Sequence, residues 1–358
     1  MNGSKEDKIA LTTKTKRAIA IGSGVAVLAG GAFFLLKNKD GLADVPGLGV
    51  FADDPKCPLN GKEPAKEGSL ERPAVALKIE NNAAAYPLSG LEDAEVVYEE
   101  PVEGGLSRFM AIYHCNDSAQ AGPVRSSRVV DPAIMSPYTL ILGAAGGNEI
   151  VREALDDAGV VLIDENNAGD AMVRVPREGV SLEHTLYGNT ARIRKLGRED
   201  YDEVPRDDIF KFGDAEGKSK KARSITVTFS PGNVVTFDWD GEVYGRSDNG
   251  APLMSSDGEQ FTADNVIVEE HTVNFVDGLS DILGTPSPEI ADVTGSGRAV
   301  LFRDGRAYVG RWVRESEDDP VRFETKEGEE MILKAGRTWI ELVPDADGDL
   351  KGSFSYAK

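Results

Sequence analysis

The sequence contains few of the residues that build metal and redox centres. Its 358 residues include two cysteines, Cys57 and Cys115, and three histidines, His114, His184 and His271. Two cysteines cannot form a four-cysteine zinc site or a dense disulfide scaffold, and no pair of histidines has a recognisable ligand spacing. We therefore expect no metal site and no cofactor.

Basic charge is scarce as well. The chain has 40 lysine and arginine residues against 61 aspartate and glutamate residues, a formal net charge of -21. Nucleic-acid binding depends on clustered lysine and arginine side chains that release counterions from the phosphates, so we expect no nucleic-acid partner. The composition, with 40% hydrophobic and 28% charged residues, is typical of a folded globular protein.

Common catalytic motifs are also missing. The sequence contains no HExxH motif, no P-loop, no GxSxG nucleophile elbow and no GxGxxG motif after a strand. Composition and motif searches therefore do not identify a reaction.

One long hydrophobic run is present, from Ala18 to Leu36, and its nineteen residues carry no charge. As a helix with a rise of about 1.5 Å per residue it would be roughly 28 Å long, close to the ~30 Å hydrocarbon thickness of a bilayer. A cleaved signal peptide is the alternative, but Phe33 to Lys37 does not provide the small residues of a cleavage site. We predict a transmembrane helix or signal anchor over residues 18–36, which is also the contact with the cell membrane.

The charges that flank this run predict its orientation. Five basic residues precede it and two follow it closely, namely Lys5, Lys8, Lys14, Lys16 and Arg17 before and Lys37 and Lys39 after. The positive-inside rule then places residues 1–17 in the cytoplasm as a basic tail. We expect a single-pass membrane protein whose acidic bulk is extracytoplasmic.

Export to an oxidising compartment changes what is expected of the two cysteines. A disulfide between Cys57 and Cys115 would stabilise the fold by about 4 kcal/mol in the chain-entropy model, because it closes a long loop of the unfolded chain. The alternative is two unrelated buried thiols. We predict the disulfide.

The first part of the exported region combines strands with helices. Residues 37–69 are rich in Gly, Pro, Asp and Lys and are typical of a stalk or linker. Short apolar runs then alternate with two helical patterns, which begin near Asp131-Pro132 and at Asn148. This interleaving predicts an α/β domain with a mixed sheet over residues 70–215.

The second part of the exported region is richer in strands. A charged, glycine-containing loop around residues 201–222 predicts a domain boundary. Beyond it, short β-prone runs are separated by turn residues such as Asp304-Gly305, which is a strong hairpin signal. We predict a smaller β-rich domain over residues 222–345, followed by a tail over residues 346–358.

Several motifs resemble one known family. They are Arg72-Pro73, Asn81-Asn82, Gly90-Leu91, Asp93-Ala94, Val97-Tyr98-Glu99, Glu103-Gly104-Gly105, Arg108-Phe109, Gly122 to Arg128 and His184 to Tyr187, with Tyr244-Gly245-Arg246, Asn265-Val266, Gly310-Arg311-Trp312 and Gly336 to Trp339 further along. Together they resemble the YerB-like bacterial lipoprotein family, a domain of unknown function with N-terminal and C-terminal parts. The resemblance runs from about Arg72 to Pro344.

The resemblance implies a location and leaves the molecular function open. Members of this family are typically surface lipoproteins or membrane-anchored proteins. This chain departs from the lipoprotein form, because no cysteine follows the apolar run in a lipobox-like context and Cys57 lies some twenty residues too late. An uncleaved helix would then replace the lipid anchor.

The loop from Gly122 to Arg128 carries the strongest binding pattern. Arg125 and Arg128 flank Ser126 and Ser127, and guanidinium groups next to hydroxyls can bind carboxylate or phosphate in a bidentate way. Candidate ligand-binding residues from neighbouring family motifs are Asn81, Asn82, Arg108 and Tyr187. The alternative is that both loop arginines pair with Glu99, Glu100 or Glu103 in a structural ion network.

A catalytic interpretation remains beside the binding one. Glu99 and Glu103, if they converged in a cleft with His184, would suit general acid and base catalysis of glycan hydrolysis. Most such glutamates are solvated, and a histidine in a loop is as often a hydrogen-bonded anchor.

The sequence thus predicts an envelope protein that binds a peptidoglycan or anionic glycan fragment, with a cell-wall glycan hydrolase as the alternative. A binding module would have its carboxylates neutralised by arginines, whereas an enzyme would keep a carboxyl group or histidine free.

Overall fold

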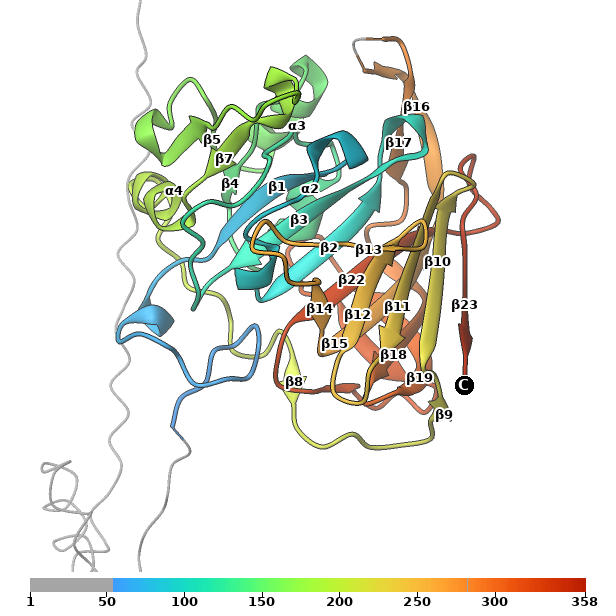
Figure 1. Cartoon of the computed structure of the whole chain (residues 1–358). Coiled ribbons are helices and arrows are strands. Elements are labelled where there is room, and N and C mark those ends of the chain that lie inside the picture. Colours follow the sequence, from blue (N-terminus) through green and yellow to red (C-terminus); the bar gives the residue numbers. More distant parts are fainter. Residues whose placement is uncertain (1–53, 282) are drawn as a thin grey trace, which may run out of the picture. The chain divides into compact units, whose positions relative to one another are not determined.

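Strands from both parts of the sequence join one eleven-stranded sheet (Figure 1). The computed structural model describes residues 54–281 and 283–358. The strand order is β20-β19-β18-β15-β22-β2-β3-β1-β4-β5, with β9 paired to β19. The strands are β1 (Val75–Asn81), β2 (Val96–Pro101), β3 (Ser107–Tyr113), β4 (Ile141–Gly143), β5 (Val161–Ile163), β9 (Lys220–Lys221), β15 (Asn265–His271), β18 (Gly295–Arg303), β19 (Arg306–Arg314), β20 (Arg322–Thr325) and β22 (Thr338–Pro344).

A second, six-stranded sheet has the order β13-β12-β11-β10-β23, with β14 paired to β12. Its strands are β10 (Ser224–Ser230), β11 (Asn233–Trp239), β12 (Tyr244–Asp248), β13 (Ala251–Pro252), β14 (Thr262–Ala263) and β23 (Ser353–Ala357). Along β10 and β11 buried and partly exposed residues alternate, as expected for strands with one face on a core.

The helices and two-stranded pairs are short. The helices are α2 (Asp131–Met135), α3 (Glu149–Asp157) and α4 (Thr190–Gly197), and 3-10 turns form at Ser69–Glu71, Ala83–Ala85, Leu91–Asp93, Glu103–Gly105, Gly169–Ala171 and Leu182–His184. The pairs are β16 (Val273–Ser280) with β17 (Pro286–Ile290), β8 (Lys211–Phe212) with β21 (Ile332–Leu333), and β6 (Met172–Arg174) with β7 (Leu186–Gly188). Asn148 caps α3 by accepting from the Val151 amide at 3.0 Å, so the start predicted for this helix is confirmed.

Two hydrophobic cores lie on opposite faces of the large sheet. On one face, Val75, Leu77 and Ile79 of β1 join side chains of the six-stranded sheet and of α4. On the other face, Ala76 and the side chains of α2 and α3 build the second core. Alternate residues of a strand point to opposite faces. The charged residues of β1 therefore point to the same face as Ala76, which is the face that α2 covers.

The turn between β18 and β19 is the one that the sequence signals most clearly. Asp304 and Gly305 connect the two strands with φ values of 54° and 66°. Positive φ at both central residues defines the tight turn that matches the twist of a hairpin, and glycine adopts it without strain. The predicted hairpin is confirmed.

The predicted α/β class is wrong, because the described chain is mostly β. Most neighbours in the large sheet are antiparallel, and a second sheet covers one face where helices were expected. The segment between β1 and β2 shows the physical reason. Pro87 and Gly90 interrupt it, so 3-10 turns take the place of a crossover helix.

The predicted membrane helix at residues 18–36 receives no support from the structure, since it lies outside the described residues. Within residues 54–281 and 283–358, no helix is long and apolar enough to cross a membrane.

The predicted domain boundary remains a prediction. Residues Pro55–Lys358 form one unit, and β22 from the second part pairs in parallel with β2 from the first. The large sheet therefore crosses the boundary expected near residues 215–222.

The predicted disulfide is present. Cys57 and Cys115 are bonded, their Cα atoms lie 6.1 Å apart, and both residues are buried. The bond ties the start of the described chain to the segment that follows β3.

Candidate functional site

Charged side chains cross the large sheet at one end of β1, β3 and β2. In the strand register Arg108 lies opposite Glu80 on one side and Glu100 on the other. Lys78 lies two residues before Glu80 and therefore on the same face. These charged residues form a row at the end of the three strands, on the face of the sheet that α2 covers.

The loop from Gly122 to Arg128 is fastened directly to β1 beside this row. The Glu80 amide donates to the Pro123 carbonyl at 2.9 Å, and the Arg125 amide donates to the Lys78 carbonyl at 3.0 Å. The Ser127 amide and hydroxyl both donate to the Gly146 carbonyl at 2.9 Å. Backbone contacts thus position the arginines of the loop, and the hydroxyl of Ser127 is used for structure.

Three arginines meet here, and we call Arg108, Arg125 and Arg128 the arginine cluster. Arg128 forms an ion pair with Glu103, and Arg125 Nε lies 3.4 Å from Glu80 Oε1. Arg108 donates to the Ser126 carbonyl at 3.0 Å and forms no ion pair with any residue of the described chain. Arg125 Nη1 also lies 4.0 Å from Glu183 Oε2, so Arg108 is the one member of the cluster without an ion pair among the described residues.

The electrostatics of the arginine cluster show the effect of the unpaired Arg108. Burial and the positive charges of Arg128 and Arg125 lower the pKa of Arg108 to about 9. Burial alone would raise the pKa of Glu103, but Arg128 and the Ser287 hydroxyl outweigh it and hold that pKa below its ordinary value. At neutral pH Arg108 is thus charged, at a cost that an added anion would relieve.

The cluster also leaves donors unused. Arg125 Nε and Arg128 Nε are shielded from solvent yet have no hydrogen-bond partner among the described residues. The side chain of Arg125 is 26% exposed, and Arg108 and Ser126 are partly exposed. The guanidinium groups of the cluster could therefore donate hydrogen bonds to a phosphate or a carboxylate group.

Glu99 and Asn81, two predicted site residues, lie on the opposite face of the sheet. Glu99 Oε2 accepts from Arg246 Nη2 at 2.7 Å, and Glu99 Oε1 accepts from Asn81 Nδ2 at 3.0 Å. Glu99 and Arg246 are fully buried. Beside them, burial and the charge of Glu99 raise the pKa of Glu341 well above its ordinary value.

The remaining predicted residues have local roles. His184 Nδ1 lies 2.7 Å from Glu80 Oε2, so His184 shares Glu80 with Arg125. Asn82 accepts from the Ala84 amide at 2.9 Å and caps a 3-10 turn. Tyr187 is buried, and burial raises its pKa.

The three predicted catalytic residues do not contact one another. Within the described chain no hydrogen bond or ion pair joins Glu99, Glu103 and His184. Each instead has its own partner, namely Arg246, Arg128 and Glu80 respectively. Glu99 and Glu103 are thus each paired with an arginine, and His184 is paired with a carboxylate.

Sequence reasoning missed the buried charges that surround the arginine cluster. Lys78 forms ion pairs with Glu100 and with Asp131, the latter at 2.6 Å, and all three side chains are buried. Burial, followed by the charges of Glu100 and Asp131, raises the pKa of Glu289 to about 8. The sequence contained a usable signal, because Lys78 and Glu80 are two charged residues at alternate positions among the apolar residues of β1.

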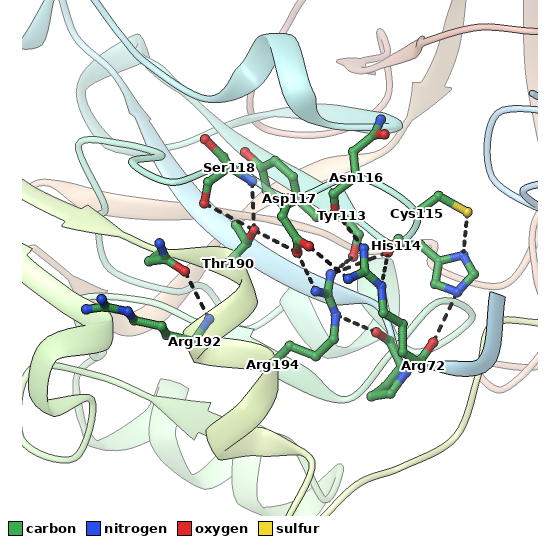
Figure 2. A network of polar contacts seen from close by, with 12 residues as sticks. Arg72, Tyr113, His114, Cys115, Asn116, Asp117, Ser118, Thr190, Arg192 and Arg194 are labelled. Carbon is green, nitrogen blue, oxygen red and sulfur yellow. Dashed lines mark hydrogen bonds and ion pairs between the residues drawn. The ribbon is translucent and has the colours of Figure 1, made fainter. Parts of the chain in front are cut away.

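A second network, around Asp117, is built differently (Figure 2). Its carboxylate binds Arg72 through Oδ2 at 2.8 Å and Arg194 through Oδ1. The other nitrogens of both guanidiniums donate to backbone carbonyls, including those of Pro73 and Tyr113. We call Arg72, Asp117 and Arg194 the Asp117 network, and its donors are all used.

The fold and the arginine cluster define a disulfide-bonded, mostly β protein with a cation-rich loop at the end of its central sheet. Models of a protein family of unknown function, DUF3048, match residues 59–202 with the N-terminal domain and residues 225–340 with the C-terminal domain. The chain belongs to the DUF3048 family, which agrees with the resemblance found in its sequence.

Two comparisons with a Bacillus subtilis protein agree with this assignment. A protein of Bacillus subtilis (strain 168) described as "Putative lipoprotein YerB" is 26% identical over 338 residues, covering 88% of this chain and 93% of that protein. The crystal structure of YerB from Bacillus subtilis matches with a TM-score of 0.69 at 24% identity, covering 84% of this chain and 99% of that chain. The structural match supports the fold.

Proposed function

We propose that this protein is an extracytoplasmic envelope protein that binds an anionic, cell-wall-derived ligand at the arginine cluster. Two observations support the location. The Cys57–Cys115 disulfide is typical of an oxidising compartment outside the cytoplasm. The Bacillus subtilis relative is described as a lipoprotein, a class of protein attached to a membrane surface.

The single observation that carries the binding proposal is the unpaired guanidinium of Arg108. The only group that accepts from it in the described chain is the Ser126 carbonyl, and burial with the charges of Arg128 and Arg125 outweighs the opposing charges of Glu103 and Glu80. A cation kept close to two other cations costs free energy unless something compensates it. A phosphate or carboxylate group bound to Arg108 and Arg125 would supply that compensation.

The contacts favour binding over hydrolysis. Glu103 has a lowered pKa because Arg128 and Ser287 stabilise its ionised form, so it is a poor general acid. Glu99 is fully buried against Arg246, where a glycan could not reach it. The hydrolase hypothesis gains no support from these residues.

Binding measurements with soluble cell-wall fragments test the proposal. Full-length wild type, Arg108→Met and Arg125→Ala are titrated with fragments that carry phosphate or carboxylate groups. We expect each variant to bind about ten- to a hundredfold more weakly, since a charge-assisted hydrogen bond contributes about 1.5–3 kcal/mol.

Arg192→Ala is the matched control, because it removes the same charge from an exposed pair with Asp170. It should bind like wild type. Equal affinity of all four proteins would overturn the proposal, and so would cleavage of the fragments by wild type together with retained binding by Arg108→Met.

A further inference from the structure

A basic cavity lies at the edge of the large sheet farther from the arginine cluster. Its volume is about 480 Å³, and it opens where β9 and β20 flank β19, next to β23. In the strand order β19 is next to one edge, whereas β1 and β3 lie toward the other. The cavity is therefore a separate feature of the molecule.

The charge of this cavity opposes that of the whole chain. Lys218, Lys220, Arg298 and Lys326 line it, together with the single carboxylate of Glu327. The chain as a whole carries a formal net charge of -21. Cations gathered in a hollow of an otherwise acidic protein focus a local positive field that attracts anions.

Two of these cations have no carboxylate partner. Among residues 54–281 and 283–358 no ion pair involves Lys220 or Lys326, and the pair between Lys218 and Glu327 is long, at 4.0 Å. Arg298 pairs with Glu270 at 2.9 Å and packs over the ring of Phe354 at 4.4 Å. Arg298 is thus held in place while the lysines remain available.

The remaining lining is suited to a polar chain that is larger than one ion. Tyr308 and Tyr356 are among its lining residues, although Tyr308 is mostly buried and one side of the Tyr356 ring packs against Phe302. Ser219 and Thr325 add hydroxyl groups to the lining. Tyrosine combines an apolar face with a polar tip, which suits contact with sugar or polyol carbons and their hydroxyls. The β9–β19 pairing, Lys220 with Ala307, fixes one wall of the cavity.

We infer that this cavity is a second anion site, which binds an extended polyanion with repeated phosphate groups, such as a phosphate-linked glycan or polyol chain. Lys220 and Lys326 bind its phosphates, and the tyrosine rings contact the carbon units between them. The site does not depend on the arginine cluster, because none of its lining residues belongs to that cluster.

The chain provides a closely matched pair of variants for a test. Lys220 and Lys221 are neighbours in β9, but only Lys220 lines the cavity. Lys220→Glu and Lys221→Glu therefore change the net charge equally, and only the first changes the site. The probe is tripolyphosphate, titrated calorimetrically into full-length protein that carries Arg108→Met, so that the arginine cluster does not contribute.

We expect Lys220→Glu and Lys326→Glu each to weaken tripolyphosphate binding at least tenfold, and Lys221→Glu to weaken it less than twofold. Equal weakening by Lys220→Glu and Lys221→Glu would mean that only net charge matters and would overturn the inference. Failure of the arginine-cluster proposal would leave this result unchanged, because the Arg108→Met background is common to all variants.

A second arm separates a soluble polyanion from a lipid surface. Vesicles that contain an anionic phospholipid are offered to the same variants, whose N-terminal residues are identical. Vesicle binding that falls only in Lys220→Glu, without any such effect on tripolyphosphate, would overturn the inference in favour of lipid headgroups.

Discussion

The Asp117 network and the arginine cluster place guanidinium groups near strands of the same sheet, yet only the network is complete. In the Asp117 network one carboxylate and several carbonyls accept from all the nitrogens of Arg72 and Arg194 (Figure 2). In the arginine cluster Arg108 has no carboxylate partner within the described chain, and Arg125 Nε makes no hydrogen bond there although Glu80 Oε1 lies 3.4 Å away. Both sites contain buried charge, but the cluster has donors left over.

This difference gives a criterion for distinguishing structural arginines from the arginines that we propose to bind a ligand. A buried ion pair whose donors are all used stabilises its surroundings, and removing one partner is costly. A guanidinium that is crowded by like charges and has no carboxylate partner carries an electrostatic cost that a bound anion would offset. The predictions below test this contrast, beginning with the largest expected effect.

Asp117→Asn should cause a large loss of stability. The change leaves Arg72 and the buried Arg194 without their shared carboxylate. We expect the free energy of unfolding to fall by about 3–5 kcal/mol, as measured by urea denaturation. Asp170→Asn breaks an exposed pair with Arg192 and should cost less than about 1 kcal/mol. Similar losses in both variants would contradict the buried role of the network.

Removing the disulfide should have a comparable but separate effect. Cys57 and Cys115 are 58 residues apart in the sequence, so a Cys57→Ser/Cys115→Ser variant should lose about 4 kcal/mol of stability. Anion binding per folded molecule should not change, because the bond contacts neither site. Urea denaturation with ligand titration below the transition checks both points, and a weakened affinity would show that the two regions are coupled.

The acid sensitivity of the Asp117 network should depend on His114. Burial and the neighbouring charge of Arg194 lower the pKa of His114 to about 4. Between about pH 4 and 6.5 the unfolded chain therefore binds a proton that the folded chain does not, so stability falls as the pH is lowered.

His114→Gln should remove up to about 3 kcal/mol of this acid-induced loss of stability, which is the free energy that corresponds to the difference between the folded and unfolded pKa of His114. Unfolding free energies at pH 4.5, 5.5 and 6.5 test it. The same pH dependence in the variant and in wild type would assign the fall to carboxylates instead.

Arg108→Met should have the smallest effect on stability. The change removes a charge that burial and Arg128 disfavour, so we expect a shift within about 1 kcal/mol, or a small gain. Arg128→Met should instead cost about 3–5 kcal/mol, because it leaves the buried Glu103 unpaired. Urea denaturation of both variants decides the point, and equal losses would make Arg108 structural.

The sequence predicted the cap of α3 at Asn148 and the β18–β19 hairpin, because each depends on a few neighbouring residues. It predicted the disulfide because an oxidising compartment favours pairing of the two cysteines. The class of the fold was missed. Whether helices or a second sheet cover a face depends on distant strands such as β10 and β11, whose positions no local signal gives.

The candidate site was found only in part for the same reason. The loop that carries Arg125 and Arg128 is visible in the sequence, but its partners come from separate segments. Glu80 is on β1, and Arg246 approaches Glu99 from β12 of the other sheet. Pairing across 147 residues, as between Glu99 and Arg246, depends on the tertiary fold.

The central claim is that the unpaired Arg108 of the arginine cluster serves to bind an anion. The most direct test is the free energy of unfolding as a function of phosphate concentration, measured in a Lys220→Glu background with and without Arg108→Met. A ligand that binds only the folded state stabilises it in proportion to the logarithm of its concentration above the Kd. We predict that phosphate stabilises the protein with Arg108 and has little effect on the Arg108→Met protein, whereas equal stabilisation of both would contradict the account.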